Sequence, residues 1–328
     1  MGEIWAVGEL VDGAPTKLTL ELATLAQQLA QSAGAEARAV LVGPGAAAAA
    51  GVVADYGPAV IAVDTDASLA DRPVSSVVAA RVAALIAERN PSIVLVGASN
   101  DGKDVAGNLL GMTDLPMLAN AAGVEWQGSA PQVEMSTFGG KLLTHSTFNG
   151  ERGIVIVRPS SVTAEPAAAA GSVETVVLDS VSELPQVRVT NRVEEAGAAA
   201  PIEEARIIVG GGRGVGNQEG FHLIEDLAEA LGGAVGATRA VVDSGWIGYG
   251  QQIGQTGKIV KPALYVACGI SGAIQHKVGV QTAGTIVAIN RDPDAPIAEF
   301  ADLFVVGDLF EIVPRLAEAI RARRSGGG

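Results

Sequence analysis

The chain has 328 residues, of which 48% are hydrophobic and 18% charged, and its formal net charge is −14 at pH 7. This length allows two domains with full cores. The acidic balance argues against a nucleic-acid partner, because phosphate binding needs clustered Lys and Arg. One Cys excludes an internal disulfide framework, and three His with one Cys make no metal-ligand cluster.

The sequence contains no feature that indicates export or membrane insertion. The first residues, MGEIWAV, begin a strand and do not read as a signal or transit peptide. Apolar runs are interrupted by charged or turn residues before they reach membrane-spanning length. We therefore expect a cytoplasmic protein that does not insert directly into a membrane.

The first half alternates between strand and helix patterns. Strands are predicted at 4–10, 37–42, 60–63 and 92–97, and helices at 18–32, 74–89 and 104–112, with a short helix starting at 46–51. Alternating βα units imply a largely parallel sheet. From 116 to 178 the pattern changes, and short strands predict antiparallel pieces at the sheet edge: 132–138, 141–148 and 153–157.

Residues 159–203 have the composition of a hinge region. The part from 160 to 171 is rich in Ala, Pro and Ser, and the part from 191 to 201 is charged and then rich in Ala. Short strands are predicted between them, at 174–178 and 187–189. Few contacts should cross such a segment, so we expect a boundary near 195–204. The predicted domains are 1–198, an α/β domain, and 199–328.

The second half is another βα series. It has predicted strands at 206–209, 234–237, 263–267, 285–289 and 303–306, helices at 219–231 and 308–323, and a frayed tail at 324–328. In open α/β sheets, ligands bind beyond the carboxyl ends of the strands. The predicted fold class is therefore α/β, with two domains that are each a largely parallel sheet flanked by helices, the second of them Rossmann-like.

Two loops of Gly and small polar residues bracket the apolar strand 263–268. They are Gly254-Gln255-Thr256-Gly257 and Gly269-Ile270-Ser271-Gly272. Gly lets a backbone approach a ligand closely, and exposed N–H groups in such loops form a nest for phosphate. Thr256, Gln275 and His276 add a hydroxyl, an amide and an imidazole. This set suits a large cofactor with a pyrophosphate and a polar heteroaromatic ring.

The common phosphate-binding motifs are absent from these loops. A P-loop fails because Gln252 stands where its first Gly belongs and Ile259 follows Lys258. The loop 210–216 does not fit GxGxxG in any register, since Val215 or Asn217 falls on the last position. Neither a Walker-type nucleotidase nor a standard dinucleotide fingerprint is indicated.

The second half resembles the C-terminal domain of the electron-transfer flavoprotein alpha (large) subunit. Six runs carry the resemblance in order and spacing: GGRGVG (211–216), GATRAVVDSGW (236–246), QIGQTGKIV (252–260), GISGAIQH (269–276), TIVAINRDPDAPI (285–297) and ADLFVVGDLFEIVP (301–314). The first half resembles the same family more weakly, mainly through IVLVGASNDGKDVAGNLL at 93–110. The resemblance implies that the domain 1–198 is nucleotide-hydrolase-like and contacts a partner, and that the domain 199–328 binds FAD.

This resemblance implies noncovalent FAD and a set of residues that bind it: Arg213, Thr238, Arg239, Ile253, Gly254, Gln255, Thr256, Ser271, Gly272, Ala273, Ile274, Gln275, His276, Asn290, Asp308 and Leu309. Within that set, the resemblance places the Thr238 hydroxyl on the pyrophosphate and Arg239 across the isoalloxazine. It also places Thr256 on flavin N5 and His276 near the C2 carbonyl. Arg239, Thr256 and His276 would tune the redox potential of the flavin.

Each of these residues also has a simpler interpretation. Arg213 could be a solvated loop charge, Thr256 a turn residue that satisfies its own backbone, and His276 a structural histidine. The resemblance puts Asn290 and Asp308 near the adenosine half, but Asn and Asp also commonly cap loops. His145 and His222 match nothing and are read as structural.

One position departs from the family pattern. The family often has Pro two residues after Trp246, where this chain has Gly248 followed by Tyr249. We expect a softer loop here, with Tyr249 placed to contact the flavin edge.

The functional reading follows from the resemblance. It implies the alpha subunit of a heterodimeric electron-transfer flavoprotein, which is an electron carrier and not an enzyme. It further implies a beta subunit with bound AMP, flavoprotein dehydrogenases such as the acyl-CoA dehydrogenases of fatty acid beta-oxidation as donors, and a membrane quinone oxidoreductase as acceptor. Three alternatives stay open: a subunit of an electron-bifurcating flavoprotein that uses NADH, a self-contained flavin or nicotinamide oxidoreductase, and a nucleotide-binding regulatory module.

Overall fold

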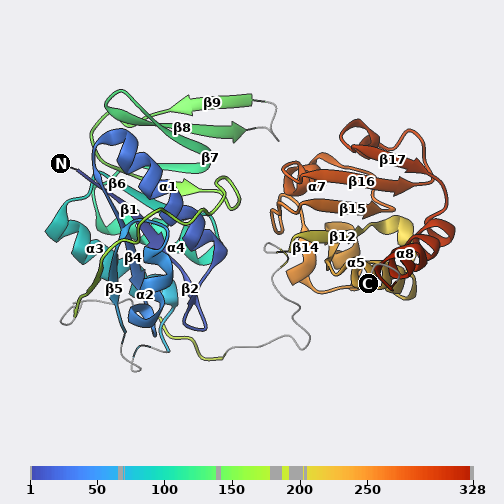
Figure 1. Ribbon diagram of the computed structural model, residues 1–328, viewed down its shortest axis with the longest axis horizontal. Coiled ribbons are helices and arrows are strands. Elements are labelled where there is room, and N and C mark those ends of the chain that lie inside the picture. The colour runs from blue at the N-terminus through green and yellow to red at the C-terminus, as the bar shows by residue number, and fades with distance from the viewer. Residues whose placement is uncertain are drawn as a thin grey trace. The chain divides into compact units, whose positions relative to one another are not determined.

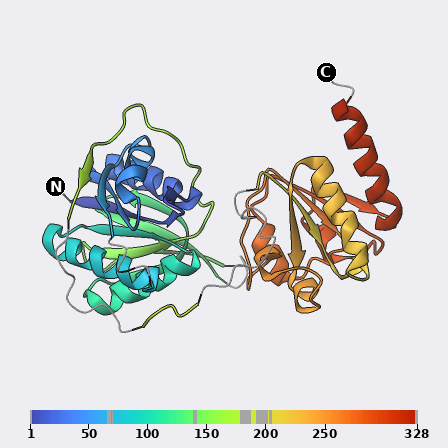
Figure 2. The ribbon, with the colours of Figure 1, turned by 90° about the horizontal axis from the view of Figure 1, so that it is seen from below.

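The computed structural model divides the chain into two compact units, Met1–Arg192 and Val193–Gly328 (Figures 1 and 2). It describes residues 2–65, 69, 71–137, 142–177, 187–191, 202 and 205–325. Most of the boundary predicted at 195–204 lies outside these residues. The strand predicted at 187–189 is wrong, because this segment pairs with no strand among the described residues. The N–H of Val189 donates to the Asp71 carbonyl at 2.7 Å.

The first unit is built on a nine-stranded sheet with the order β11-β5-β4-β1-β6-β10-β7-β8-β9. Its strands are β1 (Glu3–Gly8), β4 (Glu36–Val42), β5 (Ala59–Val63), β6 (Ile93–Gly97), β7 (Met117–Gln127), β8 (Ala130–Thr137), β9 (Leu142–Ser146), β10 (Gly153–Val157) and β11 (Val173–Thr175). A separate hairpin joins β2 (Leu10–Val11) to β3 (Ala14–Pro15). Figure 1 shows β7, β8 and β9 together at one edge of the sheet.

The antiparallel edge is only partly as predicted. β8 pairs antiparallel with β7 and with β9, but β10 lies between β6 and β7 and is parallel to both. All five residues of β10 are buried. The prediction for 153–157 was wrong because its sequence, GIVIV, is a continuous apolar run, which is typical of a parallel strand covered on both faces.

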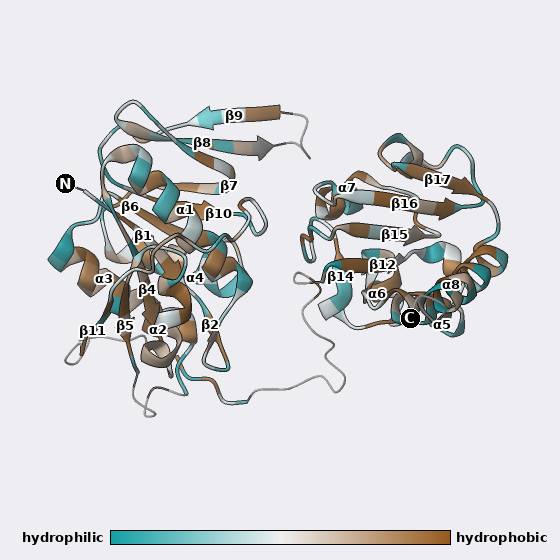
Figure 3. Ribbon diagram, viewed as in Figure 1, coloured by the Kyte–Doolittle hydropathy of each residue, from teal (hydrophilic) through white to brown (hydrophobic). Residues whose placement is uncertain are grey.

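Four helices cover the two faces of this sheet. They are α1 (Lys17–Ala33), α2 (Ala46–Ala54), α3 (Val74–Arg89) and α4 (Asn100–Met112). The side chains of Ile4 and Ala6 pack with α1 and α2, whereas Trp5 and Val7 pack with α3 and α4. This alternation follows from the period of two in a strand. Figure 3 shows that the strands of this sheet are mainly apolar, whereas α1, α3 and α4 carry both polar and apolar residues.

The second unit is a six-stranded, entirely parallel sheet with the order β14-β13-β12-β15-β16-β17. Its strands are β12 (Ile207–Gly211), β13 (Ala234–Thr238), β14 (Gln252–Ile253), β15 (Leu264–Cys268), β16 (Thr285–Asn290) and β17 (Leu303–Val306). Its helices are α5 (His222–Leu231), α6 (Arg239–Asp243), α7 (Ile274–Val280) and α8 (Leu309–Ser325). The α/β fold class is confirmed in both units.

Helices α5 and α8 pack on one face of this second sheet, over Val209, Val266 and Ile289. The other face buries Ile208, Tyr265 and the end of α7. The tail predicted at 324–328 begins later than expected, because α8 continues to Ser325; residues 326–328 lie outside the described part of the chain. Within the described residues, no helix has both the length and the apolar character needed to cross a bilayer.

Candidate functional site

A cavity of about 630 Å³ lies at the carboxyl ends of β12, β13, β15 and β16. It brings together most of the predicted site residues: Arg213, Thr238, Arg239, Ile253, Gly254, Gln255, Thr256, Ser271, Ala273, Gln275, His276 and Asn290. The alternation of strands and helices explains this convergence, because every loop that follows a parallel strand reaches the same edge of the sheet. A volume of this size is typical of a small-molecule site.

Four predicted residues do not line the described wall of this cavity: Gly272, Ile274, Asp308 and Leu309. The Asp308 carboxylate accepts the Phe310 N–H at 2.8 Å and so begins α8. Leu309 is buried in the core beneath that helix. Gly272 has a φ of 89°, and a Cβ there would overlap the backbone of Ile297. For Asp308, the interpretation as a capping residue therefore describes this structure better.

The glycine loops are packed backbone against backbone. The N–H of Gly212 donates to the Cys268 carbonyl at 2.9 Å, and that of Gly214 donates to the Gly269 carbonyl at 3.0 Å. A Cβ on Gly214 would lie 2.7 Å from the Cα of Gly269. Side chains larger than hydrogen would push the two loops apart. The glycines thus bring the loop that carries Arg213 against the loop after β15.

The charge around the cavity is locally positive. Three arginines line it, Arg213, Arg239 and Arg291, against two carboxylates, Asp243 and Asp292. The excess of one positive charge contrasts with the net charge of −14 on the whole chain. The Arg239 Nε donates to Asp243 Oδ2 at 3.3 Å, and both side chains are exposed. Guanidinium groups in this arrangement suit an anionic, planar ligand.

Thr238 occupies the N-cap position of α6, but its side chain makes no capping hydrogen bond. Its hydroxyl therefore stays available to the cavity. Asn290 is engaged with the protein instead: its Nδ2 donates to the Ile270 carbonyl at 2.9 Å, and its Oδ1 accepts the Asp292 N–H at 3.1 Å. Asn290 both lines the cavity and organises the loops around it.

Gln252 holds the loop that presents Thr256, and the sequence interpretation missed it. Its Nε2 donates to the Thr256 carbonyl at 3.0 Å and to Thr256 Oγ1 at 3.1 Å. The Tyr249 hydroxyl donates to the same carbonyl at 2.7 Å. Since Oγ1 accepts from Gln252, the hydroxyl of Thr256 keeps its own proton to donate into the cavity. The available signal was a polar amide two residues from Gly250 on one side and two residues from Gly254 on the other.

His276 lies at the cavity wall, but its side chain is almost fully buried, with 6% exposed. Its Nδ1 lies 3.1 Å from the Ile253 carbonyl, and its Nε2 lies 2.8 Å from the Tyr265 hydroxyl. A carbonyl can only accept, so Nδ1 carries the proton and Nε2 accepts from Tyr265. Burial lowers the pKa of His276 to about 4, although the bond to Ile253 opposes this shift. The ring is therefore neutral near pH 7.

Tyr265 is the second residue that the sequence interpretation missed. It lies on β15, is fully buried, and its hydroxyl reaches toward Gly210 on the neighbouring strand β12. A Cβ on Gly210 would overlap that hydroxyl. Burial also raises the pKa of Tyr265, so the hydroxyl keeps its proton. A Tyr inside an otherwise aliphatic strand was the signal, because a buried hydroxyl needs a polar partner.

Taken together, these groups can bind and orient a ligand, but they do not form an acid–base pair. Among the described residues of the cavity, the imidazole has both nitrogens engaged and a depressed pKa. The arginines, the hydroxyls of Thr238 and Thr256 and the closely packed glycines fit a dinucleotide that carries a pyrophosphate and a polar ring system.

Comparisons with known proteins cover both units. Residues 4–181 match the electron transfer flavoprotein domain, and residues 201–281 match the electron transfer flavoprotein FAD-binding domain. The chain is 42% identical over 327 residues to electron transfer flavoprotein subunit alpha of Mycobacterium tuberculosis, which covers 99% of this chain and 100% of that protein. It is 34% identical to the Bacillus subtilis subunit alpha over 97% of each chain. It is also 34% identical to Protein FixB of Clostridium saccharobutylicum, over 95% of this chain and 94% of that protein.

Proposed function

Because the chain belongs to the electron transfer flavoprotein alpha-subunit family and carries that family's FAD-binding domain, we propose that it is the FAD-binding half of a heterodimeric electron carrier. The observation that carries the proposal is the cavity of the second unit. There, three arginines, two hydroxyls and tightly packed glycine loops converge at the carboxyl ends of four parallel strands. A carrier needs this kind of site, because the protein contributes the position and the electrostatics while the cofactor supplies the redox chemistry.

The residues at the edge of the sheet would hold the phosphates and the ring system. We assign Arg213 and the Thr238 hydroxyl to the pyrophosphate, since both line the cavity, Arg213 is exposed, and the Thr238 side chain makes no capping hydrogen bond. The planar guanidinium of Arg239 is assigned to the face of the isoalloxazine. The Thr256 hydroxyl, positioned by Gln252, is assigned as the donor to flavin N5.

His276 is assigned to the pyrimidine end of the flavin as a neutral group. Its two ring hydrogen bonds, to Tyr265 and Ile253, hold its orientation and leave no spare proton to donate from the ring. A permanent positive charge at the site would then come from Arg239, which stays protonated in any protein environment. Asn290 is assigned to the adenosine half through the loop that it organises.

The partners proposed here extend the family membership. We expect a beta subunit that carries AMP and completes the flavin site. We also expect flavoprotein dehydrogenases, such as acyl-CoA dehydrogenases, as electron donors and a membrane quinone oxidoreductase as acceptor. The cytoplasm is the expected compartment. In this scheme the chain itself transforms no substrate, and its residues bind and orient the cofactor.

The experiment is to purify the chain together with a co-expressed beta subunit and to denature the complex. We expect about one FAD per alpha chain and a second chain that elutes with it. Release of FMN, or no flavin after reconstitution with the beta chain, would contradict the proposal. A flavin-retaining monomer that oxidises a substrate by itself would favour the self-contained oxidoreductase. A second FAD in the heterodimer together with reduction by NADH would favour the bifurcating alternative.

A further inference from the structure

The first unit contains a second cavity, of about 670 Å³, which the proposed electron-carrier function does not use. It lies at the carboxyl ends of β1, β4 and β6. β1 and β6 are neighbours in the sheet, but α1, which follows β1, and α4, which follows β6, pack on opposite faces. Such a reversal in a parallel sheet opens a crevice, and α/β proteins bind ligands there.

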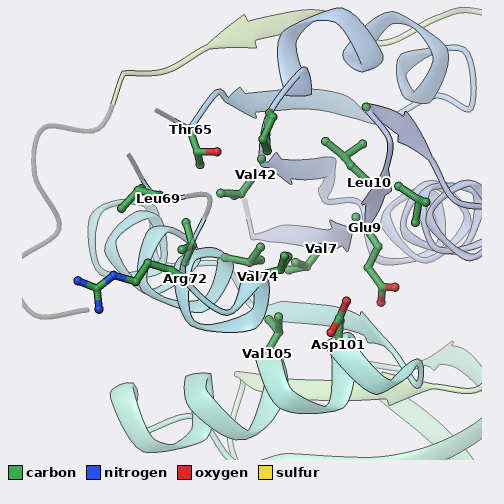
Figure 4. Close-up of a pocket in the computed structure, with 18 of the residues that line it drawn as sticks. Val7, Glu9, Leu10, Val42, Thr65, Leu69, Arg72, Val74, Asp101 and Val105 are labelled. Carbon is green, nitrogen blue, oxygen red and sulfur yellow. The ribbon is translucent and has the colours of Figure 1, made fainter. Parts of the chain in front are cut away.

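The walls of this cavity are mainly aliphatic. Side chains from three strands and two helices form them: Val7, Val42, Val77, Val78, Val96 and Val105. Figure 4 shows Val7, Val42 and Val105 around the space. All of these valines are buried, and all but Val77 belong to the core between the sheet and helices α3 and α4, so packing holds them in place. A rigid aliphatic wall of this kind suits a flat apolar ring.

Two carboxylates, Glu9 and Asp101, lie at the same end of the cavity (Figure 4). Glu9 is held in place: its backbone N–H donates to Thr19 Oγ1 at 2.7 Å, the Thr19 hydroxyl donates back to the Glu9 carbonyl at 2.9 Å, and Ser99 donates to its Oε1 at 2.6 Å. A Cβ on Gly102 would lie 2.7 Å from that oxygen, so glycine leaves room for the carboxylate.

The ionised form of the Glu9 side chain is destabilised by its surroundings in the chain. Burial raises the pKa of its carboxyl group, and the charge of Asp101 raises it further, while the bond from Ser99 opposes them. A partly buried carboxylate beside a second carboxylate costs free energy unless donors satisfy it. A carboxyl group with a perturbed pKa in a cleft is a mark of a functional site. An ionised carboxylate can only accept hydrogen bonds, so its natural partners in a ligand are hydroxyl or amino donors.

Phosphate groups fit this cavity poorly. At the start of α2, next to the lining residue Pro44, Asp64 already accepts the N–H of Ala47 at 3.2 Å. At the start of α4, the Ser99 hydroxyl accepts the N–H of Gly102 at 2.8 Å. At each of these two helix starts, one N–H that could bind an anion is thus already taken by an acceptor of the chain itself.

The basic groups near the cavity support the same conclusion. Of the lining residues that the structure describes, Arg72 alone is basic, and Figure 4 shows its guanidinium pointing away from the space. Its Nη1 donates to the Val187 carbonyl at 3.4 Å. The carboxylates of Glu9 and Asp101 therefore dominate the electrostatics of this end of the cavity, and they repel a second anion.

We propose that the first unit binds an uncharged molecule of the nucleoside class, with its heteroaromatic ring among the valines and its hydroxyl or amino donors on Glu9 and Asp101. A phosphorylated form of the same molecule binds at least tenfold more weakly. The proposal concerns the first unit only and does not depend on the electron-transfer function of the second.

The test uses the full-length chain loaded with FAD, so that the cavity of the second unit is filled, and the FAD content of each sample is measured. Isothermal titration with adenosine, guanosine and AMP gives the affinities. We expect one site for adenosine or guanosine with a Kd of about 100 µM or tighter, and weaker AMP binding. Failure of FAD loading even in the presence of the beta chain would count against the proposed function, whereas the dependence of nucleoside binding on Glu9 would still be readable.

The variants locate the site. Glu9→Gln should weaken nucleoside binding at least tenfold, because a neutral amide replaces a charged acceptor. Asp101→Asn is the second variant, since its exposed side chain can change without disturbing the fold. Asp104→Asn, on the same helix but outside the cavity lining, is the matched control and should leave the affinity unchanged. No nucleoside binding below 1 mM, tighter binding of AMP, or equal affinities in all variants would each overturn the proposal.

Discussion

Acidification should destabilise the second unit through His276, because this ring is buried as a neutral group. Its pKa lies near 4 in the folded chain, against an ordinary value of 6.5. The unfolded chain therefore binds an extra proton as the pH falls below about 6.5, and the folded chain does not until about 4. Stability contributed by the neutral ring is present above pH 6.5 and is lost as the pH falls from 6.5 toward 4.

The magnitude follows from the two pKa values. One unit of difference corresponds to about 1.4 kcal/mol, so the complete loss below pH 4 is roughly 3 kcal/mol. Between about pH 7.5 and pH 5, the same relation gives a loss of about 2 kcal/mol in the free energy of unfolding. Only 6% of the side chain is exposed, so solvent screening reduces this figure little. Burial raises the pKa of Cys268 to about 12 and that of Tyr265 as well, so neither neighbour titrates in this range.

Nuclear magnetic resonance of the chain labelled in its histidines is the direct assay. The chain has only three His, and the resonance missing from a His276→Gln variant identifies the buried ring. We expect this resonance to stay constant from about pH 7.5 to 5.5, with nitrogen shifts of a ring protonated at Nδ1. Urea unfolding at about pH 7.5 and at about pH 5 then gives the loss in the free energy of unfolding. The loss measured for the His276→Gln variant, which cannot titrate at this position, is subtracted from that of the wild type to remove the contribution of the carboxylates.

A His276 resonance that titrates near the ordinary pKa of a histidine would contradict a buried neutral ring. Equal losses of the free energy of unfolding in the wild type and the His276→Gln variant on acidification would contradict it as well. Either result would mean that water reaches the ring, and that the bonds to Tyr265 and Ile253 do not hold a neutral imidazole.

Three further predictions concern the same unit. Gly212→Ala should lower the free energy of unfolding by about 1–3 kcal/mol in a urea titration, because a Cβ there overlaps the Gly269 carbonyl. The control Gly250→Ala has nothing within 4 Å of its Cβ and should change the same quantity by less than about 0.5 kcal/mol. Arg239→Ala should retain FAD but lower the potential for the first electron by tens of millivolts in a reductive titration, with Arg239→Lys between, and an unchanged potential would contradict its assignment. Thr256→Val should shift the flavin potential and Thr256→Ser should restore it, while equal potentials in all three proteins would return Thr256 to a purely structural role.

The local order of the chain was readable from its residues. Alternating apolar patterns predicted most strands and helices within a few residues, because the periods of 2 and 3.6 record which face of each element is buried. Loops such as 254–257 and 269–272 could be placed near one another from sequence, since loops after parallel strands share one edge of the sheet. The runs shared with the electron transfer flavoprotein family supplied the identity of the cofactor.

Contacts between distant segments were decided only by the tertiary structure. The continuous apolar run of β10 is typical of a buried parallel strand, but its place between β6 and β7 depends on partners about 60 and 37 residues away along the chain. Likewise, nothing near His276 in sequence indicates that its two ring nitrogens bond to Tyr265 and Ile253. Nor does the local sequence indicate that burial lowers its pKa and keeps the ring neutral. Burial and hydrogen-bond partners are properties of the packed chain, so the protonation state of a residue follows from them and not from its motif.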